Sequence, residues 1–398
     1  MTLLIEPFRL AIPESELHAL RTRLLLTRWP DDPGNESWKY GVNATYLRTL
    51  TDYWLYEYDW RAVEERINSY PQFRASVQGI PIHYIHVRAE SCANPIPLVI
   101  MHGWPWSFWD LHLIIDPLVD PKKYGGDQSD AFDMVIPSLP GYGFSSPLPI
   151  AGINFWKTAD LINQLMTEGL GYAQYGASGG DWGALISSQL GHKYAGSVVG
   201  VHLLHAMVLD QFEGPRSWDV TARSWDQRAP VPSSLLKYVS HFAVHTLDPQ
   251  TLAYALSDSP VGLLAWMLER WRAWGDTKGD VEKVFSREHM ITTAMIYWLT
   301  NTAGSSMRAY ADAVFHPWQP SHSRTPVVEA PVGLTLLGGE NPPGIKTEER
   351  AAAFLAGPRA RYFNVQFVNA HEIGGHFGYF ENPAAVVHDI RETFRPMR

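Results

Sequence analysis

The stretch Tyr-Gly-Ala-Ser-Gly-Gly-Asp-Trp-Gly at residues 175–183 contains two overlapping candidate nucleophiles. In one frame Ser178 has a glycine two residues away on each side, which is the Gly-x-Ser-x-Gly pattern of esterases. In the other frame Asp181 has the same small neighbours. Small neighbours are needed where a nucleophile occupies a sharp, strained turn between a strand and a helix. The stretch therefore predicts an α/β fold with a nucleophile at such a turn.

Helix propensity favours Asp181 over Ser178. A helix that began after Ser178 would carry Gly179, Gly180 and Gly183 in its first turn, each costing about 1 kcal/mol relative to alanine. A helix that began after Asp181 has only one early glycine, and its N-terminus would stabilise the charged carboxylate. The simple structural alternative is a helix-capping aspartate that follows a Gly-Gly turn.

The first half of the chain divides into two parts. Residues 1–94 form a leading segment, and residues 95–206 alternate short apolar runs with helical stretches, as expected of a mostly parallel sheet covered on both faces. In the leading segment the patterns predict helices over about 13–30 and 43–68 and strands over 73–77 and 82–87. The apolar runs of the second part lie at 98–101, 132–137 and 198–204.

The second half also divides into two parts. Residues 207–325 are helical and rich in tryptophan, which is what a lid over a sheet would look like. Residues 326–398 return to the strand pattern. Strands are predicted over 332–337 and 362–367, and a final helix over 383–394.

Composition restricts the protein to a few classes. With 398 residues, of which 45% are hydrophobic and 18% charged, the chain can bury a large core. A formal charge of −9 argues against nucleic-acid or anionic-membrane partners. Cys92 is the only cysteine, so no intrachain disulfide can form. The N-terminus lacks the pattern of a signal peptide and no apolar run has the length of a membrane helix, so we expect a cytoplasmic protein without a membrane anchor.

Three motifs carry a resemblance to a known family. His-Gly-Trp-Pro at 102–105, Pro-Ser-Leu-Pro-Gly-Tyr-Gly-Phe-Ser at 137–145 and Gly-Gly-Asp-Trp-Gly at 179–183 resemble the microsomal-type epoxide hydrolases of the α/β-hydrolase superfamily. The resemblance covers nearly the whole chain and is nearer to the soluble microbial branch. It implies an α/β-hydrolase fold with a helical lid and an N-terminal segment that wraps around it. It also implies an oxyanion hole formed by the backbone N–H groups of Trp104 and Trp182.

The same resemblance assigns a base and an acid near the C-terminus. Gly-Gly-His-Phe at 374–377 implies His376 as the base, and Glu340, after the strand at 332–337, as the acid that orients it. Glu372 is a weaker competitor for the acid. A zinc site at His371, Glu372 and His376 is excluded because the spacing is wrong and two glycines interrupt the helix that such a site needs. We therefore expect no metal and no cofactor.

Opening an epoxide also requires a proton donor at its oxygen, for which the family uses two lid tyrosines. Tyr310 is implied as one of them by the segment Ser-Ser-Met-Arg-Ala-Tyr at 305–310. The position of the other falls on His241, and Tyr238 lies about one helical turn earlier. His241 and Tyr238 are therefore candidates for substrate binding, as are Trp106 and Trp109 near the oxyanion loop.

These residues together imply an enzyme that adds water to a small-molecule epoxide. Asp181 would form an alkyl ester, and His376 would then activate water to release a vicinal diol. The many lid tryptophans support the hypothesis that the substrate is bulky or aromatic. We also expect a role in secondary metabolism and a homodimer. The alternatives are a haloalkane dehalogenase with the same nucleophile, a Ser178 esterase, and a non-catalytic binding protein with this fold.

Overall fold

A nine-stranded sheet forms the centre of the protein, and the computed structural model describes residues 3–212 and 233–398, with side chains in the second range described from residue 239 onward. The strand order is β1-β2-β3-β5-β4-β6-β7-β8-β9. The pairs β1–β2, β2–β3 and β3–β5 are antiparallel, and the other pairs are parallel. The strands are β1 (Ile5–Phe8), β2 (Gln72–Val77), β3 (Ile80–Val87), β4 (Ile96–Met101), β5 (Phe132–Pro137), β6 (Tyr175–Gly179), β7 (Val198–Leu203), β8 (Val328–Leu337) and β9 (Phe363–His371).

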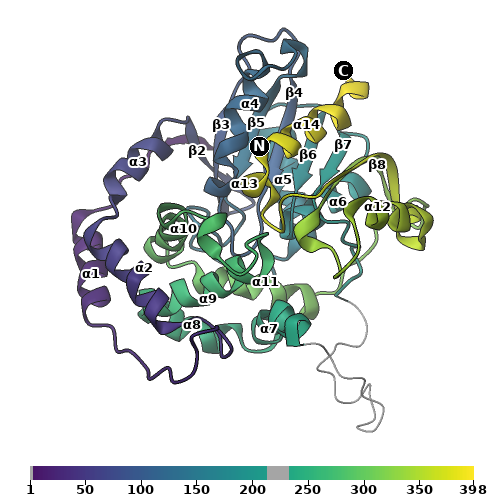
Figure 1. Cartoon of the computed structure of the whole chain (residues 1–398). Helices are drawn as coiled ribbons and strands as arrows, with labels where there is room; N and C mark the ends of the chain where they lie inside the picture. Colours follow the sequence, from purple (N-terminus) through teal and green to yellow (C-terminus); the bar gives the residue numbers. More distant parts are fainter. Residues whose placement is uncertain (1–2, 213–232) are drawn as a thin grey trace.

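Helices cover the sheet, and within each group of covering helices the members contact each other (Figure 1). One group is α4 (His112–Val119) with α14 (Pro383–Phe394), and the other is α5 (Phe155–Gln164) with α6 (Trp182–Lys193). Short helices α12 (Thr347–Ala356) and α13 (Gly378–Glu381) flank the last strands. Apolar residues of the central strands are fully buried between these layers, as in β4, where Leu98 to Met101 are inaccessible. This arrangement confirms the predicted α/β-hydrolase fold.

In the part of the lid that the structure describes, five helices lie between β7 and β8. They are α7 (Ser233–Leu247), α8 (Pro249–Asp258), α9 (Pro260–Trp274), α10 (Arg287–Leu299) and α11 (Ala303–Phe315). Helix α9 begins with Ser259, whose side chain caps the helix, followed by Pro260 at a position where the missing N–H has no cost. The lid chain thus leaves the sheet at the carboxyl end of β7 and returns to it at the amino end of the neighbouring parallel strand β8.

The leading segment both extends the sheet and contacts the lid. Its helices are α1 (Glu14–Leu25), α2 (Ala44–Tyr56) and α3 (Trp60–Asn68), which form an arc around the lid in Figure 1. Helices α1 and α2 pack on α9, and α2 also packs on α10. One such contact is the indole N–H of Trp54 on the sulfur of Met295, at 3.2 Å.

Three details of the leading segment differ from the sequence-based prediction. Strand β1 was not predicted, since it is short and contains Pro7, and it joins the sheet only through β2. The helix expected to reach residue 30 ends at Leu25. The stretch 43–68 forms two helices, because Asp59 accepts hydrogen bonds from the N–H groups of Arg61 and Ala62 and so starts a new helix.

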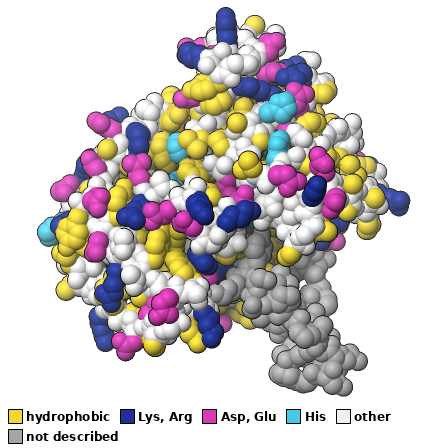
Figure 2. All heavy atoms as spheres, in the orientation of Figure 1, with side chains coloured by type: hydrophobic (Ala, Val, Ile, Leu, Met, Phe, Trp, Pro, Cys, Tyr) yellow, Lys and Arg dark blue, Asp and Glu magenta, His cyan; other side chains and the backbone are white. Residues whose placement is uncertain are grey.

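The surface carries charges of both signs. In Figure 2, acidic and basic side chains alternate over the visible face without a large field of one sign. None of the described helices combines the length and the apolar character that crossing a membrane requires.

Candidate active site

Asp181 occupies the sharp turn between β6 and α6. Its backbone has φ 51° and ψ −124°, a conformation that residues other than glycine rarely adopt. The turn depends on close backbone approach, because a Cβ on Gly179 would collide with the backbone of Gly183, and one on Gly183 would collide with the carbonyl oxygen of Met101. The glycines on either side of Asp181 are thus explained by close packing, while the positive φ belongs to the aspartate itself.

The surroundings of Asp181 keep its carboxylate charged. The backbone N–H of Trp104 donates to Oδ1 over 2.9 Å, and Oδ2 lies 3.5 Å from Nε2 of His376. Burial opposes the charged form, but His376 and the backbone N–H groups of Trp104 and Trp182 outweigh it and lower the pKa of Asp181. These two N–H groups come from the loop after β4 and from the first residue of α6, so both segments present a backbone donor to the Asp181 carboxylate.

His376 follows the last strand and lies between two carboxylates. Its Nδ1 is 3.2 Å from Oε1 of Glu340, and its Nε2 faces Asp181. Burial favours the neutral ring, but the hydrogen bonds and charges of Asp181 and Glu340 outweigh it and raise the pKa of His376 to about 9. Burial likewise opposes the charge on Glu340, and contacts with His205 and His376 hold the pKa of Glu340 well below its usual value.

The structure brings Glu340, and not its weaker competitor Glu372, to His376. Glu372 instead accepts the backbone N–H of Thr347 at 3.0 Å. His371 pairs with Asp389 of α14 at 2.8 Å. The 36-residue separation between Glu340 and His376 is spanned by α12 and β9, which return the chain to the same edge of the sheet.

A cavity of about 260 Å³ opens next to Asp181 and is lined mainly by aromatic and apolar side chains. Tyr310 from α11 and His241 from α7 face it, and their rings are 5.4 Å apart in an edge-to-face contact. Burial, followed by the nearby charge of Asp181, raises the pKa of Tyr310 well above its usual value, so its hydroxyl stays protonated. Burial holds the pKa of His241 well below its usual value, so that ring stays neutral. The lining residues are Asp181, Trp182, Leu185, His205, Met207, Gln211, Phe212, Val239, His241, Phe242, Trp274, Tyr310, Glu340 and His376.

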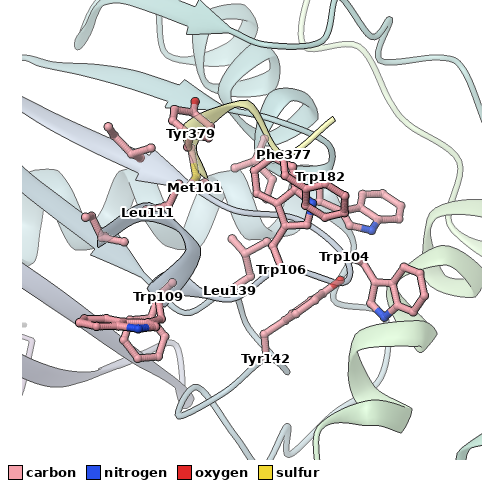
Figure 3. Packing of buried hydrophobic residues seen from close by; sticks show 14 of the residues in the cluster. Met101, Trp104, Trp106, Trp109, Leu111, Leu139, Tyr142, Trp182, Phe377 and Tyr379 are labelled. Carbon is pink, nitrogen blue, oxygen red and sulfur yellow. The ribbon is translucent and has the colours of Figure 1, made fainter. Parts of the chain in front are cut away.

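Two of the predicted substrate contacts lie away from this cavity. Trp106 is fully buried, with its ring 5.6 Å from that of His376. Trp109 stacks on His112 at 4.5 Å, and Figure 3 shows it on the other side of the aromatic cluster from Trp104 and Trp182. Both are core residues, and the expectation of substrate contact is corrected for both.

The lid tryptophans differ in what they contact. Among the lid tryptophans that the structure describes, Trp274 lines the cavity and the others do not, and Trp318 packs on α6, where its indole N–H donates to Gln189 at 2.7 Å. Trp218 and Trp225, and the side chain of Tyr238, lie outside the described residues.

Ser178 is enclosed within β6, three residues before the turn. Its Oγ is hydrogen-bonded to Nδ1 of His202 at 2.9 Å and to the hydroxyl of Tyr379 at 2.8 Å, and no part of the residue is exposed. The serine of the esterase-like frame thus links buried strands and helices and has no access to the cavity.

His205 is a site residue that sequence reasoning missed. It stands two residues after β7, and its Nδ1 accepts the backbone N–H of Asp181 at 2.7 Å while its Nε2 lies 3.1 Å from Glu340. Its position could have identified it, because side chains at the carboxyl ends of parallel strands meet at the site edge of such sheets.

The described residues contain one group that could hold a metal ion. It consists of His205, Glu340 and His376, whose potential ligand atoms lie within 4.8 Å of one another. These atoms are also hydrogen-bonding partners at 3.1 and 3.2 Å, and the other nitrogen of His205 is occupied by the N–H of Asp181.

A sheet of this order, an aspartate at the strand–helix turn, and a histidine and a glutamate after later strands define an α/β-hydrolase. The "alpha/beta hydrolase fold" family model matches residues 96–274, and "Epoxide hydrolase N terminus" matches residues 5–111.

Similar proteins support a narrower assignment. A protein of Stigmatella aurantiaca, described as "Putative epoxide hydrolase", is 35% identical over 99% of this chain and 86% of its own length. Epoxide hydrolase 1 of Oryctolagus cuniculus is 31% identical over 97% and 88%. The crystal structure of juvenile hormone epoxide hydrolase from Bombyx mori superimposes with a TM-score of 0.80, at 27% identity, over 100% of this chain and 94% of that one. The chain belongs to the epoxide hydrolase family.

Proposed function

We propose that this enzyme hydrolyses an epoxide to a vicinal diol through a covalent ester on Asp181. The observation that carries the proposal is the position of Asp181. One carboxylate oxygen accepts the N–H of Trp104, and the other faces His376 beside the cavity. A carboxylate held in this way is both a nucleophile and, once esterified, a carbonyl group already bound in an oxyanion hole.

In the first half of the reaction, Oδ2 of Asp181 attacks an epoxide carbon and the bond from that carbon to the ring oxygen breaks. Tyr310 gives its proton to that oxygen, so the substrate becomes a hydroxyalkyl ester, and the tyrosinate recovers a proton from solvent. His241 is the candidate for a second hydrogen-bond donor to the same oxygen, because it is neutral, lines the cavity and lies beside Tyr310.

In the second half, His376 removes a proton from water, and the water oxygen attacks the ester carbonyl. The N–H groups of Trp104 and Trp182 stabilise the oxyanion, a contribution of about 3 kcal/mol per donor. The bond between the carbonyl carbon and the alkyl oxygen then breaks, the departing alkoxide takes the proton back from His376 and leaves as the diol, and the Asp181 carboxyl group loses its proton to solvent. Because the ester carries no charge, one of the two contacts that hold the pKa of His376 at about 9 is lost before this step. The base is thus more easily neutral when water must be deprotonated.

The cavity supports an aromatic epoxide as substrate. Trp182, Phe212, Phe242 and Trp274 supply flat apolar surfaces to a cavity that Asp181 and Tyr310 also line. A tailoring role in secondary metabolism, a cytoplasmic location and a homodimeric assembly remain part of this proposal. Faster turnover of a short aliphatic epoxide than of styrene oxide would count against the aromatic preference.

A single turnover of styrene oxide in ¹⁸O-water tests the mechanism. We expect the label in the Asp181 carboxylate, read by mass spectrometry of the peptide, and unlabelled diol, because water attacks the ester carbonyl and not the epoxide carbon. Asp181→Asn should form no ester, His376→Gln should accumulate the ester, and Ser178→Ala should still turn over. Label in the diol during the first cycle would refute the ester. Halide release from bromoalkanes without diol formation from styrene oxide would favour the dehalogenase alternative, which the tyrosine at 310 disfavours.

A further inference from the structure

His205 connects the backbone of the nucleophile to the acid that orients the base. The backbone N–H of Asp181 donates to Nδ1 of His205 over 2.7 Å. On the other side of the ring, Nε2 of His205 lies 3.1 Å from Oε1 of Glu340. Residues from the segments after β7 and after β8 thus meet at the turn that holds Asp181.

These two contacts determine which nitrogen of His205 carries the proton. An Nδ1 that accepts a backbone N–H has no hydrogen of its own, so in the neutral ring the hydrogen is on Nε2. Nε2 therefore donates to Glu340. A doubly protonated ring would place an N–H against the N–H of Asp181 and break the first bond.

Glu340 receives a second donor at the same oxygen. Nδ1 of His376 lies 3.2 Å from Oε1, and the rings of His205 and His376 stack with centroids 4.4 Å apart and planes inclined by 26°. The chain of contacts runs from the Asp181 backbone through His205 and Glu340 to His376, and the other nitrogen of His376 faces the Asp181 carboxylate. These groups thus form a closed ring of contacts, of which the 3.5 Å approach of His376 to Asp181 is the longest.

We propose that His205, in its neutral form with the proton on Nε2, is a positioning residue for both halves of the reaction. Through Nδ1 it holds the backbone of Asp181 in its unusual left-handed conformation, and through Nε2 it withdraws part of the Glu340 charge from His376. The second effect sets how strongly the base holds its proton. The role in turnover rests on the proposed function, but the effect on His376 does not require a substrate.

Two substitutions of His205 separate its hydrogen bonds from its shape. His205→Phe keeps a ring of similar size and removes both bonds. His205→Gln keeps one acceptor and one donor at a spacing similar to that of the ring nitrogens and cannot take up a proton near neutral pH. A matched control is His192→Phe. His192 is also buried, bonded at Nδ1 to the carbonyl of Val327 at 2.7 Å and accepting the N–H of Ser321 at Nε2 at 2.8 Å, but it lies at the far end of α6.

The first measurement is the pKa of His376, read by NMR of its ring nitrogens without substrate. In His205→Phe we expect this pKa to rise by roughly half a unit or more, because Glu340 then directs its full charge at His376. His205→Gln and His192→Phe should leave it near the wild-type value. An unchanged pKa in a folded His205→Phe protein would refute the proposal, whether or not the enzyme hydrolyses epoxides.

The second measurement is steady-state turnover of styrene oxide. We expect kcat to fall about 10- to 100-fold in His205→Phe, with KM changing less than kcat, and to recover most of its value in His205→Gln. A fall in kcat matched by His192→Phe would show a merely structural role. Loss of wild-type activity after dialysis against a chelator would show that His205, Glu340 and His376 hold a metal, and it would overturn the proposal. Wild-type protein that forms no diol would refute the proposed function alone.

Discussion

At the scale of single residues, Tyr310 and His241 both line the cavity beside Asp181 and contact each other. Both are buried, both have pKa values shifted so that the uncharged form persists, and their rings are in edge-to-face contact. Trp104 stacks on His241 with centroids 5.4 Å apart and planes inclined by 5°. The same tryptophan thus gives its backbone N–H to the nucleophile and its ring to a candidate donor.

We expect Tyr310→Phe to slow formation of the alkyl ester by about 100-fold, the range in which a positioned proton donor acts. His241→Phe keeps the stacking on Trp104 and removes only the ring nitrogens, so a smaller decrease in the same step is expected. Rapid-quench measurement of the ester separates this step from its hydrolysis. Equal rates of ester formation in wild type and Tyr310→Phe would remove Tyr310 from the mechanism.

At the scale of elements, α2 holds the lid through one face. Trp54 of α2 is almost fully buried against Met295 of α10. Tyr56, two residues later on α2, is mostly exposed. We expect Trp54→Ala to lower the free energy of unfolding by about 3–5 kcal/mol. Tyr56→Ala is the matched control, with a change within about 0.5 kcal/mol. Urea unfolding followed by circular dichroism measures both, and equal effects would show that α2 does not support the lid.

Elements with strong local signals were predicted well from the sequence. The last helix lies where it was expected, at 383–394, because Asn382 caps it and Pro383 occupies its first position. The buried strands β4 and β5 were recognised by continuous apolar runs. Strand β1 was missed because its four residues carry little pattern of their own and depend on pairing with β2.

The site was predictable where chain order or family motifs constrain it. Asp181, His376 and Glu340 were named from the sequence, and the structure brings them together. Which aromatic side chains face the cavity depends on helix packing in the lid, which no short motif encodes. Sequence reasoning therefore chose Trp106 and Trp109, which are in the core, did not single out Trp274 among the lid tryptophans, and missed His205.

At the scale of the whole molecule, buried histidines make stability depend on pH. Burial lowers the pKa of five fully or nearly fully buried histidines far below 6.5, so they stay neutral in the folded protein when the unfolded chain would be protonated. The unfolded state therefore binds more protons, and stability falls as pH falls below 6.5, by about 1.4 kcal/mol per pH unit for each group. These residues are His83, His102, His202, His241 and His245.

Two groups act in the opposite direction. The pKa of His376 is raised to about 9, so its stabilising contribution to the free energy of unfolding grows as pH falls from 9 to 6.5. Burial raises the pKa of Glu381 to about 7, so the cost of its buried charge disappears as pH falls from 7 towards 4.5. Five groups against two leave a net loss, and we expect the free energy of unfolding to be roughly 4 kcal/mol lower at pH 5.5 than at pH 7.5.

Urea unfolding at the two pH values measures this difference. His245→Phe removes one of the five groups and should reduce the difference by about 1.4 kcal/mol, while His388→Gln, at an exposed position of α14, should not change it. Equal stability at both pH values would contradict the protonation states assigned to the buried histidines.

The leading segment that adds strands to the sheet also packs on the lid, through α1 and α2 on α9 and α2 on α10. In protein engineering, the lid and residues 1–94 should therefore be transferred together from one homologue to another, although more than a hundred residues separate them in the chain. A chimaera that takes its lid from one homologue and residues 1–94 from another would lose the matched surfaces between Trp54 and α10. Sequence changes at these surfaces should accordingly be inherited in pairs across the family.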